Sequence, residues 1–365
     1  MRNYNEVLRD VAVHEPVFLT KNGRGRYALM DIQDYERTQA TIRKNEEGVV
    51  KSMHLFNRQI NNWQDWGKVY QSIPAFTPLV EYILKREKLP PAKIEKLTPG
   101  TNAVFKVGRY VIKIFAPAES GIDQTLDLQT ELFAMRRVNE TSVAAPIMVM
   151  HGFVADKYHF AYMITEYIEG AEFTDAVKSM SAEEKTTVGR KLRVVTDKMN
   201  TSCESFNGID VIHDMGRHRR WDNRYAEHFK TERLEYIKSY DYGGKVFVHG
   251  DLCGDNILLA SDGELYIIDF ADAVLAPKVY EHALVAVELF NLDPVLLYGY
   301  FGDYSADELA DICFNGLLIH DFGGDIVAGH IGKPSEFLFL EDLRKRLKQK
   351  IAGNKLEFRS TPTGE

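Results

Sequence analysis

The sequence is poor in cysteine and lacks long apolar runs. Its 365 residues include three cysteines, Cys203, Cys253 and Cys313. An odd number of widely spaced cysteines argues against a disulfide framework or a zinc cluster and predicts a reducing compartment, the cytoplasm. No apolar run approaches the roughly 18 residues that a membrane helix needs, and the polar start over residues 1–6 indicates no signal peptide. We therefore expect a cytoplasmic protein without a membrane partner.

A strong positive charge is also missing. The net charge is −8; residues 1–51 carry nine Lys/Arg and eight Asp/Glu, whereas residues 52–365 carry 36 and 45. An acidic body does not favour broad nucleic-acid binding, because contacts to phosphate need basic side chains. It would suit a cationic small molecule, and solubility is the alternative explanation.

The first 45 residues predict a small α/β unit. Helical spacing over residues 3–13 and 34–44 flanks two β-rich segments, residues 16–20 and 26–30. The Asn-Gly pair at positions 22 and 23 between these segments is typical of a hairpin turn.

This unit resembles the prevent-host-death family of antitoxins. The resemblance lies in Arg2-Asn3-Tyr4-Asn5-Glu6-Val7-Leu8, Glu15-Pro16-Val17, Thr20-Lys21-Asn22-Gly23, Leu29-Met30 and Tyr35-Glu36. It implies a homodimer formed through this unit and binding of operator DNA. The first strand of that family is absent here, and the charge near +1 argues against DNA binding, which we keep as an alternative only.

Residues 46–92 predict a helical connector. The segment from Gln59 to Tyr70 places apolar residues on one helical face. Thr77 is predicted to cap a second helix with Pro78 at its first position, and that helix should stop before Pro90.

Residues 93–170 predict a small lobe of five strands and one helix. The expected strands are residues 94–97, 103–107, 110–115, 147–154 and 160–168, with a helix over residues 127–138. The remaining segment, residues 171–365, reads as mostly helical, and Ser181 with Glu184 forms a capping box. The predicted fold class is α+β: a two-lobed protein-kinase-like fold with a five-stranded antiparallel small lobe, a mostly helical large lobe and the N-terminal α/β unit.

Three polar residues between apolar runs indicate the chemistry. Asn256 lies five positions after Asp251, and Asp269 lies thirteen after Asn256. This is the spacing of a kinase site, in which one carboxylate meets the acceptor hydroxyl and an amide and a second carboxylate hold magnesium. Asp251 is therefore the candidate catalytic residue, and Asn256 and Asp269 are the candidate metal ligands. His249 is expected to brace the loop by hydrogen bonds.

The small lobe should supply the nucleotide contacts. Lys113 stands alone in an apolar strand and should reach the phosphates, with Glu131 on the next helix as its partner and Glu119 as the competitor. The turn that contains Gly100, Thr101 and Asn102 should cover the phosphates with backbone N–H groups. Thr165 and Tyr167 are the predicted hinge residues, which offer backbone groups to adenine.

Residues 93–330 resemble the aminoglycoside phosphotransferase and choline kinase-like family. The resemblance lies in His249-Gly250-Asp251-Leu252, Asn256-Ile257-Leu258, Ile268-Asp269-Phe270 and the segment from Thr165 to Gly170. It implies ATP or GTP, Mg2+, and phosphoryl transfer to a hydroxyl of a small molecule such as an aminoglycoside, another amino alcohol or a sugar. Gly250 stands where protein kinases carry arginine, which favours a small-molecule kinase.

The acceptor site is expected in the helical insert of residues 210–242 and in the helices after residue 272. The carboxylates considered for a cationic acceptor are Asp222, Glu227, Glu232, Glu281 and Asp321, and the alternative for each is a salt-bridged or solvated helix face. Arginines at 217, 219, 220 and 224 weaken that argument. Two alternatives remain from the sequence: a DNA-binding regulator with a ligand-sensing kinase-like domain, and a protein kinase of a toxin–antitoxin system.

Overall fold

The chain forms two units, Met1–Asn57 and Arg58–Glu365. The computed structural model describes the backbone of residues 17–21, 24–29, 54–98, 100–122, 124–221 and 224–360. Its side chains are described over residues 54–98, 100–122, 124–218, 221 and 224–355. The division between the units falls inside the predicted connector.

The described part of the first unit is an antiparallel hairpin. Strands β1 (Val17–Lys21) and β2 (Arg24–Leu29) pair from Val17 opposite Leu29 to Lys21 opposite Arg24. The two predicted strands are therefore confirmed. The predicted helices over residues 3–13 and 34–44 and the turn at residues 22 and 23 lie outside the described residues.

Two helices open the second unit. Helix α3 (Trp63–Val69) begins after Asn62, whose side chain accepts a hydrogen bond from the Asp65 N–H. Helix α4 (Ile73–Arg86) ends before the prolines, as predicted, but it begins five residues earlier than the expected first residue, Pro78. The prediction that Thr77 caps this helix is wrong. The proline at position 74 already stands in its first turn, and buried side chains from position 75 onward continue the helical stripe.

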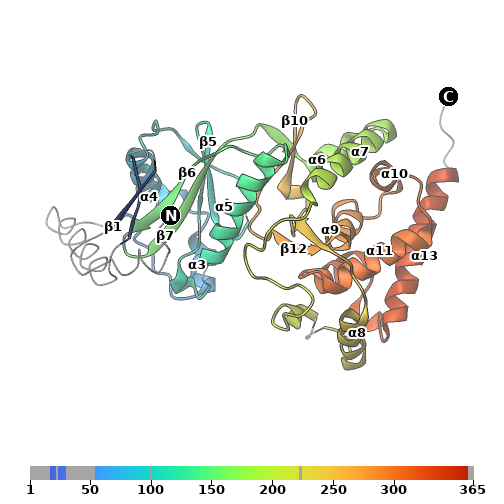
Figure 1. Ribbon diagram of the computed structural model, residues 1–365. Coiled ribbons are helices and arrows are strands. Elements are labelled where there is room, and N and C mark those ends of the chain that lie inside the picture. Colours follow the sequence, from blue (N-terminus) through green and yellow to red (C-terminus); the bar gives the residue numbers. More distant parts are fainter. Residues whose placement is uncertain are drawn as a thin grey trace. The chain divides into compact units, whose positions relative to one another are not determined.

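A five-stranded antiparallel sheet forms the small lobe, and helix α5 (Thr125–Glu140) runs beside it (Figure 1). The strand order is β3-β4-β5-β7-β6. The strands are β3 (Ile94–Lys96), β4 (Ala103–Val107), β5 (Tyr110–Ile114), β6 (Met148–Ala155) and β7 (His159–Glu166). Phe115, Leu128 and Met163 form a buried cluster between helix and sheet, which fixes α5 against the strands. This confirms the predicted small lobe.

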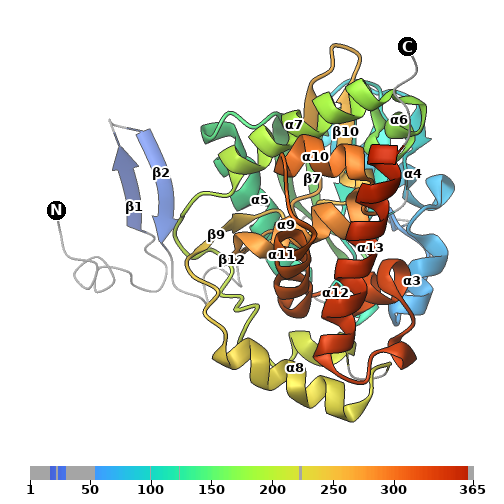
Figure 2. The same cartoon turned by 90° about the vertical axis from the view of Figure 1, so that its right-hand side faces the viewer.

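The large lobe is mostly helical. Its helices are α6 (Phe173–Ala176), α7 (Ala182–Met199), α8 (Glu227–Ser239), α9 (Lys278–Leu284), α10 (Pro294–Phe301), α11 (Ala306–Ile319), α12 (Gly323–Ile326) and α13 (Leu340–Ser360). Short strands are β8 (Gly170–Glu172), β9 (Lys245–Val248), β10 (Ile257–Ala260), β11 (Leu265–Ile267) and β12 (Val274–Pro277). Helix α13 packs against α11 and α10, and Figure 2 shows it running alongside α11.

Short 3₁₀- and π-helical segments complete the second unit. The 3₁₀ turns are η1 (Ala118–Ser120), η2 (Val177–Ser179), η3 (Arg217–Trp221), η4 (Gly254–Asn256) and η7 (Pro334–Glu336). Two π-helical segments, η5 (Val285–Leu289) and η6 (Val327–Ile331), continue α9 and α12.

One apolar core fills the large lobe. The predicted capping box at Ser181 and Glu184 is present and starts α7. Helices α7 and α10 approach closely at Gly189 and Gly299, where a Cβ atom on Gly299 would lie 2.5 Å from the Thr186 carbonyl oxygen. Any larger residue there would force the helices apart.

None of the helices in the described part of the chain is long and apolar enough to cross a membrane.

Candidate active site

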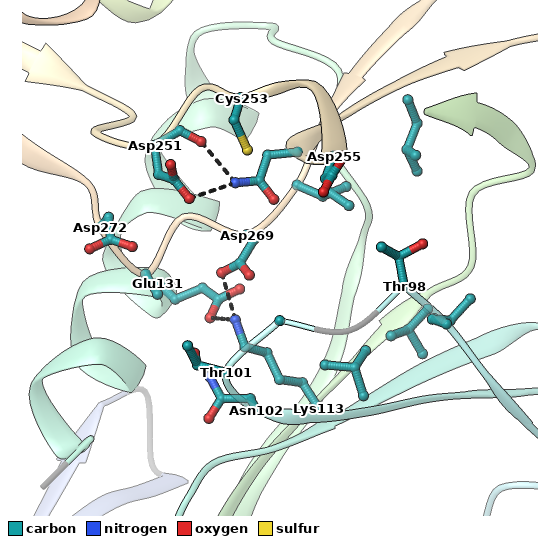
Figure 3. A pocket seen from close by; sticks show the side chains of 18 of the residues that line it. Thr98, Thr101, Asn102, Lys113, Glu131, Asp251, Cys253, Asp255, Asp269 and Asp272 are labelled. Atoms are coloured by element: carbon teal, nitrogen blue, oxygen red, sulfur yellow. Dashed lines mark hydrogen bonds and ion pairs between the residues drawn. The ribbon is translucent and has the colours of Figure 1, made fainter. Parts of the chain in front are cut away.

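A cavity of about 720 Å³ lies between the small-lobe sheet and the loops that follow β9 and β11 (Figure 3). Residues more than 150 positions apart in the sequence meet along its wall. All of the sequence-predicted site residues line it: Gly100, Thr101, Asn102, Lys113, Glu131, Thr165, Tyr167, Asp251, Asn256 and Asp269. The structure therefore brings the whole predicted set into one place.

Lys113 lies between two carboxylates at the centre of this cavity. Its Nζ atom is 2.7 Å from Glu131 Oε2 and 2.7 Å from Asp269 Oδ1 (Figure 3). Lys113 and Glu131 are 6% and 2% exposed, whereas part of the Asp269 side chain is open to the cavity. Burial opposes the charge on Lys113, but the two carboxylates outweigh it and raise the pKa of Lys113. The lysine is thus a fixed cation where phosphate charge could be received.

Asn256 holds the loop that carries Asp251. The Asn256 Nδ2 group donates to the Asp251 backbone oxygen at 2.8 Å and to Asp251 Oδ2 at 3.0 Å. Burial, followed by the negative charges of Asp272 and Glu288, raises the pKa of Asp251 to about 7. A carboxylate with this pKa can both accept a hydroxyl proton and release it near neutral pH.

His249 ties the catalytic loop to the neighbouring loop. Its Nδ1 atom accepts from the Asp251 N–H at 3.2 Å, and its Nε2–H group donates to the Ile268 carbonyl at 3.0 Å. Burial lowers the pKa of His249 to about 4, so the ring is neutral, as these two bonds require. The expected bracing role of His249 is present in the structure.

Glu281 on α9, one of the carboxylates considered for a cationic acceptor, instead supports the loop that carries Asp251. The side chain is fully buried, and Oε2 accepts from the backbone N–H groups of His249 and Gly250. Gly250 has a φ of 84°, and a Cβ atom there would lie 2.0 Å from the Asp272 carbonyl oxygen. Glycine is required at this position because any side chain would collide with backbone.

Asn256 and Asp269 are suited to hold magnesium. Because Asn256 directs its Nδ2 group to Asp251, its Oδ1 oxygen is left on the opposite side of the amide. Lys113 occupies Oδ1 of Asp269 and lowers its pKa against the effect of burial, so Asp269 is ionised and has a second oxygen. Oxygen ligands from one carboxylate and one amide, completed by phosphates and water, match the preference of Mg2+.

The hinge lies next to these residues, but its hydrogen-bonding pattern differs from the prediction. Thr165 and Tyr167 both line the cavity. The Tyr167 N–H group, however, donates to the Arg109 carbonyl at 2.9 Å, so it is not available as the predicted donor to adenine. Ile168 also lines the cavity, and no described residue accepts a hydrogen bond from its N–H group. Backbone groups alternate in direction along an extended segment, and the sequence pattern does not determine which residue's N–H group faces the cavity.

Carboxylates gather at the large-lobe end of the cavity. This acidic group consists of Asp255, Asp272, Glu288 and Asp325. Burial, followed by the charges of Asp255 and Asp325, raises the pKa of Glu288. Glu288 has no hydrogen-bond partner among the described residues. The sequence reasoning missed Glu288 and Asp325; a single carboxylate in the apolar run of residues 283–290 was the available signal for Glu288.

The carboxylates expected to bind the acceptor lie elsewhere. Glu227 is paired with Lys230, and Glu232 accepts from the Leu340 N–H. Asp321 forms a two-bond ion pair with Arg217. These contacts agree with the alternative considered for each, a paired or solvated helix face; Asp222 lies outside the described residues.

The sequence profile of the Phosphotransferase enzyme family matches residues 100–312. This is more than half of the chain, and the chain belongs to that family. No curated protein matches the sequence significantly.

Solved structures share the fold at low identity. The GDP complex of wild-type aminoglycoside 2'-phosphotransferase-IIIa is 16% identical, with a TM-score of 0.50 over 74% of this chain and 98% of that chain. The GDP complex of a mutant of that enzyme is 17% identical, with a TM-score of 0.51 over 77% of this chain and 94% of that chain. Choline kinase LicA from Streptococcus pneumoniae is 15% identical, with a TM-score of 0.48 over 76% of this chain and 98% of that chain. The two aminoglycoside 2'-phosphotransferase structures, with TM-scores of 0.50 and 0.51, show that this chain shares their two-lobed fold.

Proposed function

We propose that this protein transfers the γ-phosphoryl group of ATP or GTP to a hydroxyl of a small molecule. The observation that carries the proposal is the meeting of Lys113, Asp251, Asn256 and Asp269 in one cavity. Together they supply three requirements of phosphoryl transfer: a cation for the phosphates, a carboxylate for the hydroxyl, and two oxygen ligands for magnesium. The known GDP complexes of structurally similar enzymes motivate testing GTP beside ATP.

The proposed reaction assigns one task to each side chain. Lys113, held by Glu131, binds the phosphates and keeps them in place. Asp251 orients the acceptor hydroxyl and takes its proton as the new O–P bond forms and the bond from the γ-phosphorus to the bridging oxygen breaks. The nucleoside diphosphate leaves. Magnesium, held by Asn256 and Asp269, would neutralise the charge on the phosphates.

The hinge and the turn before β4 are proposed to hold the rest of the nucleotide. The Glu166 carbonyl and the Ile168 N–H are the expected partners of the base, beside Thr165 and Tyr167. The backbone of Gly100, Thr101 and Asn102 is expected to face the phosphates.

The acceptor is proposed to be an amine-bearing alcohol, such as an aminoglycoside or another amino alcohol. The acidic group at the large-lobe end supports this choice, because an ammonium group would be attracted to Glu288 and its neighbours. A neutral sugar is the competing class. Because ATP and magnesium are abundant in the cytoplasm, the proposed reaction agrees with the predicted location.

A screen of nucleotide consumption tests the function. Purified protein is incubated with Mg2+ and ATP or GTP in the presence of aminoglycosides, amino alcohols, sugars or nucleosides. We expect acceptor-dependent release of nucleoside diphosphate with an amine-bearing alcohol and no release by the Asp251→Asn variant. Diphosphate release at equal rates by wild type and variant would rule out the proposed site.

The N-terminal unit carries a separate hypothesis, that of a homodimer related to the antitoxin-like resemblance. The observed hairpin of β1 and β2 motivates it. Light scattering should then give a dimer for the full chain and a monomer for residues 58–365. Gel shifts with the protein's own promoter at low salt test the alternative function, a DNA-binding regulator or toxin–antitoxin component.

A further inference from the structure

Helix α3 contacts the turn that is proposed to cover the phosphates. The indole Nε1–H group of Trp66 donates to the Thr101 carbonyl at 2.8 Å, across 35 positions of sequence. Helix α3 lies before residues 100–312, the range that matches the family profile. The Trp66 side of the contact therefore lies outside the range that the family profile matches.

Trp66 is held rigidly at this contact. The side chain is 1% exposed, and its ring packs edge-to-face against Phe76 of α4 with centroids 5.9 Å apart. Phe76 in turn packs against Phe105 of β4, with centroids 5.5 Å apart. Aromatic pairs of this kind restrict the orientation of both rings. The donor is thus fixed relative to the sheet that carries Lys113.

This hydrogen bond orients the peptide group between Thr101 and Asn102. The described residues contain no cis peptide bond, and in a trans peptide the N–H points opposite to the C=O. Because the Thr101 carbonyl is directed to Trp66, the Asn102 N–H is directed away from Trp66. Asn102 lines the cavity beside Lys113 (Figure 3), and no described residue accepts a hydrogen bond from its N–H group.

A second contact fixes the other side of Asn102. Its Oδ1 atom accepts from the Ala116 N–H at 3.2 Å, just beyond the strand of Lys113. Asn102 is 5% exposed, and a backbone N–H in such a place is usually satisfied by a partner. A phosphate oxygen of a nucleotide bound in the cavity would be a suitable acceptor for this N–H group.

We infer that Trp66 is a positioning residue for nucleotide binding: its hydrogen bond to Thr101 holds the Asn102 N–H toward the phosphates. This inference rests on the proposed nucleotide-dependent function. It makes the helical connector part of the catalytic unit, since loss of one indole N–H outside the cavity should weaken phosphate binding.

The test compares Trp66→Phe, which keeps an aromatic ring but removes the N–H, with Trp63→Phe, which alters a 37% exposed tryptophan of the same helix. Calorimetry measures binding of MgADP and of adenosine to the full-length proteins. Trp66→Phe should weaken MgADP binding by roughly 3- to 10-fold, the effect of one neutral hydrogen bond, and leave adenosine binding unchanged. Trp63→Phe should change neither.

Unchanged MgADP affinity in Trp66→Phe would overturn the inference, as would equal weakening of MgADP and adenosine binding. If wild-type protein binds neither ligand, the proposed function itself fails. A second measurement needs no altered Trp66. In wild-type protein labelled with 15N-tryptophan, the NMR signal of the Trp66 indole N–H should change its chemical shift on addition of MgADP and keep it on addition of adenosine. A chemical shift that does not change with MgADP would also overturn the inference.

Discussion

The two ends of the cavity handle charge in opposite ways. At the nucleotide end, Lys113 lies 2.7 Å from both Glu131 and Asp269, so opposite charges are already in contact. At the large-lobe end, Glu288 lies near Asp255 and Asp325 without a hydrogen-bond partner among the described residues, and its pKa is raised. Arg224 compensates one member of this group by pairing with Asp325.

This difference indicates which end of the cavity is preorganised for its ligand and which end would need a positive charge from the ligand. The buried ion pairs of Lys113 hold their geometry before a nucleotide arrives, which lowers the reorganisation needed during the reaction. At the other end, burial and then the neighbouring carboxylates raise the pKa of Asp251 and of Glu288, and a bound cation would relieve the part that is due to repulsion. Under the proposed function, the first end would position the nucleotide and the second would select the acceptor.

The largest effect is expected from removing a charge at the nucleotide end. Asp269→Ala should abolish magnesium-dependent nucleotide binding and lower kcat/KM by at least about 10³-fold, because the carboxylate both pairs with Lys113 and is the proposed metal ligand. Calorimetry with and without Mg2+ measures the binding. Wild-type affinity for MgATP in this variant would exclude Asp269 as a ligand.

The next effect should separate chemistry from binding. Asp251→Asn keeps the shape of the side chain and the contact with Asn256, but it removes the proton acceptor. We expect kcat to fall by at least about 10²-fold, the usual scale for a positioned acid/base group, with nucleotide affinity nearly unchanged. Steady-state kinetics with the acceptor from the screen gives kcat, and calorimetry gives the affinity. Full turnover would remove Asp251 from the mechanism.

Loosening the lysine should have a smaller effect at the same end. In Glu131→Gln, Lys113 would keep Asp269 as its one ion-pair partner among the described residues, so the lysine and a bound metal would compete for that carboxylate. The expected fall in kcat/KM for the nucleotide is roughly 10-fold, in the range of one hydrogen bond to a charged group.

Glu119→Gln is the matched control for this prediction. Glu119 was the competing partner in the sequence, and the structure places it exposed in η1, where its removal should leave the kinetics unchanged. Equal losses in the two variants would contradict a specific role for Glu131.

The same comparison explains which parts of the site could be predicted from sequence. Lys113 could be found because strand alternation makes one cation in an apolar strand conspicuous, and its pairing with Glu131 followed from the order of strand and helix. Asp251, Asn256 and Asp269 lie on neighbouring loops, so their spacing in sequence reflects their spacing in the fold.

Features that depend on phase or tertiary packing could not be predicted. Tyr167 was one residue out of phase with the available hinge N–H, because the pairing of β7 with β5 decides which groups are used. Glu281 carries a charge that suggested the acceptor site, yet its helix buries it under the catalytic loop. Glu288 was hidden because a π-helical segment inside an apolar run turns it toward the cavity.

The smallest effect is expected at the acceptor end, from Glu288→Gln. With an amine-bearing acceptor, KM should rise by roughly 3- to 10-fold while nucleotide affinity changes little, because a single partly solvated charge is lost. The increase should shrink at high salt, since ions screen the attraction. Glu227→Gln is the control, as Glu227 is exposed and paired with Lys230.

The pH dependence gives the sharper version of this test. The pKa of Glu288 is raised by burial and by Asp255 and Asp325, so the carboxyl gains its proton at a higher pH than an ordinary glutamate does. As the pH falls through that pKa, Glu288 loses its charge and its attraction for an ammonium group. The acceptor KM of the wild type should therefore rise toward that of Glu288→Gln, and the two values should converge at low pH. A constant ratio of the two KM values across the pH range, or a preference for neutral acceptors in both proteins, would show that the acidic group does not select the acceptor by charge.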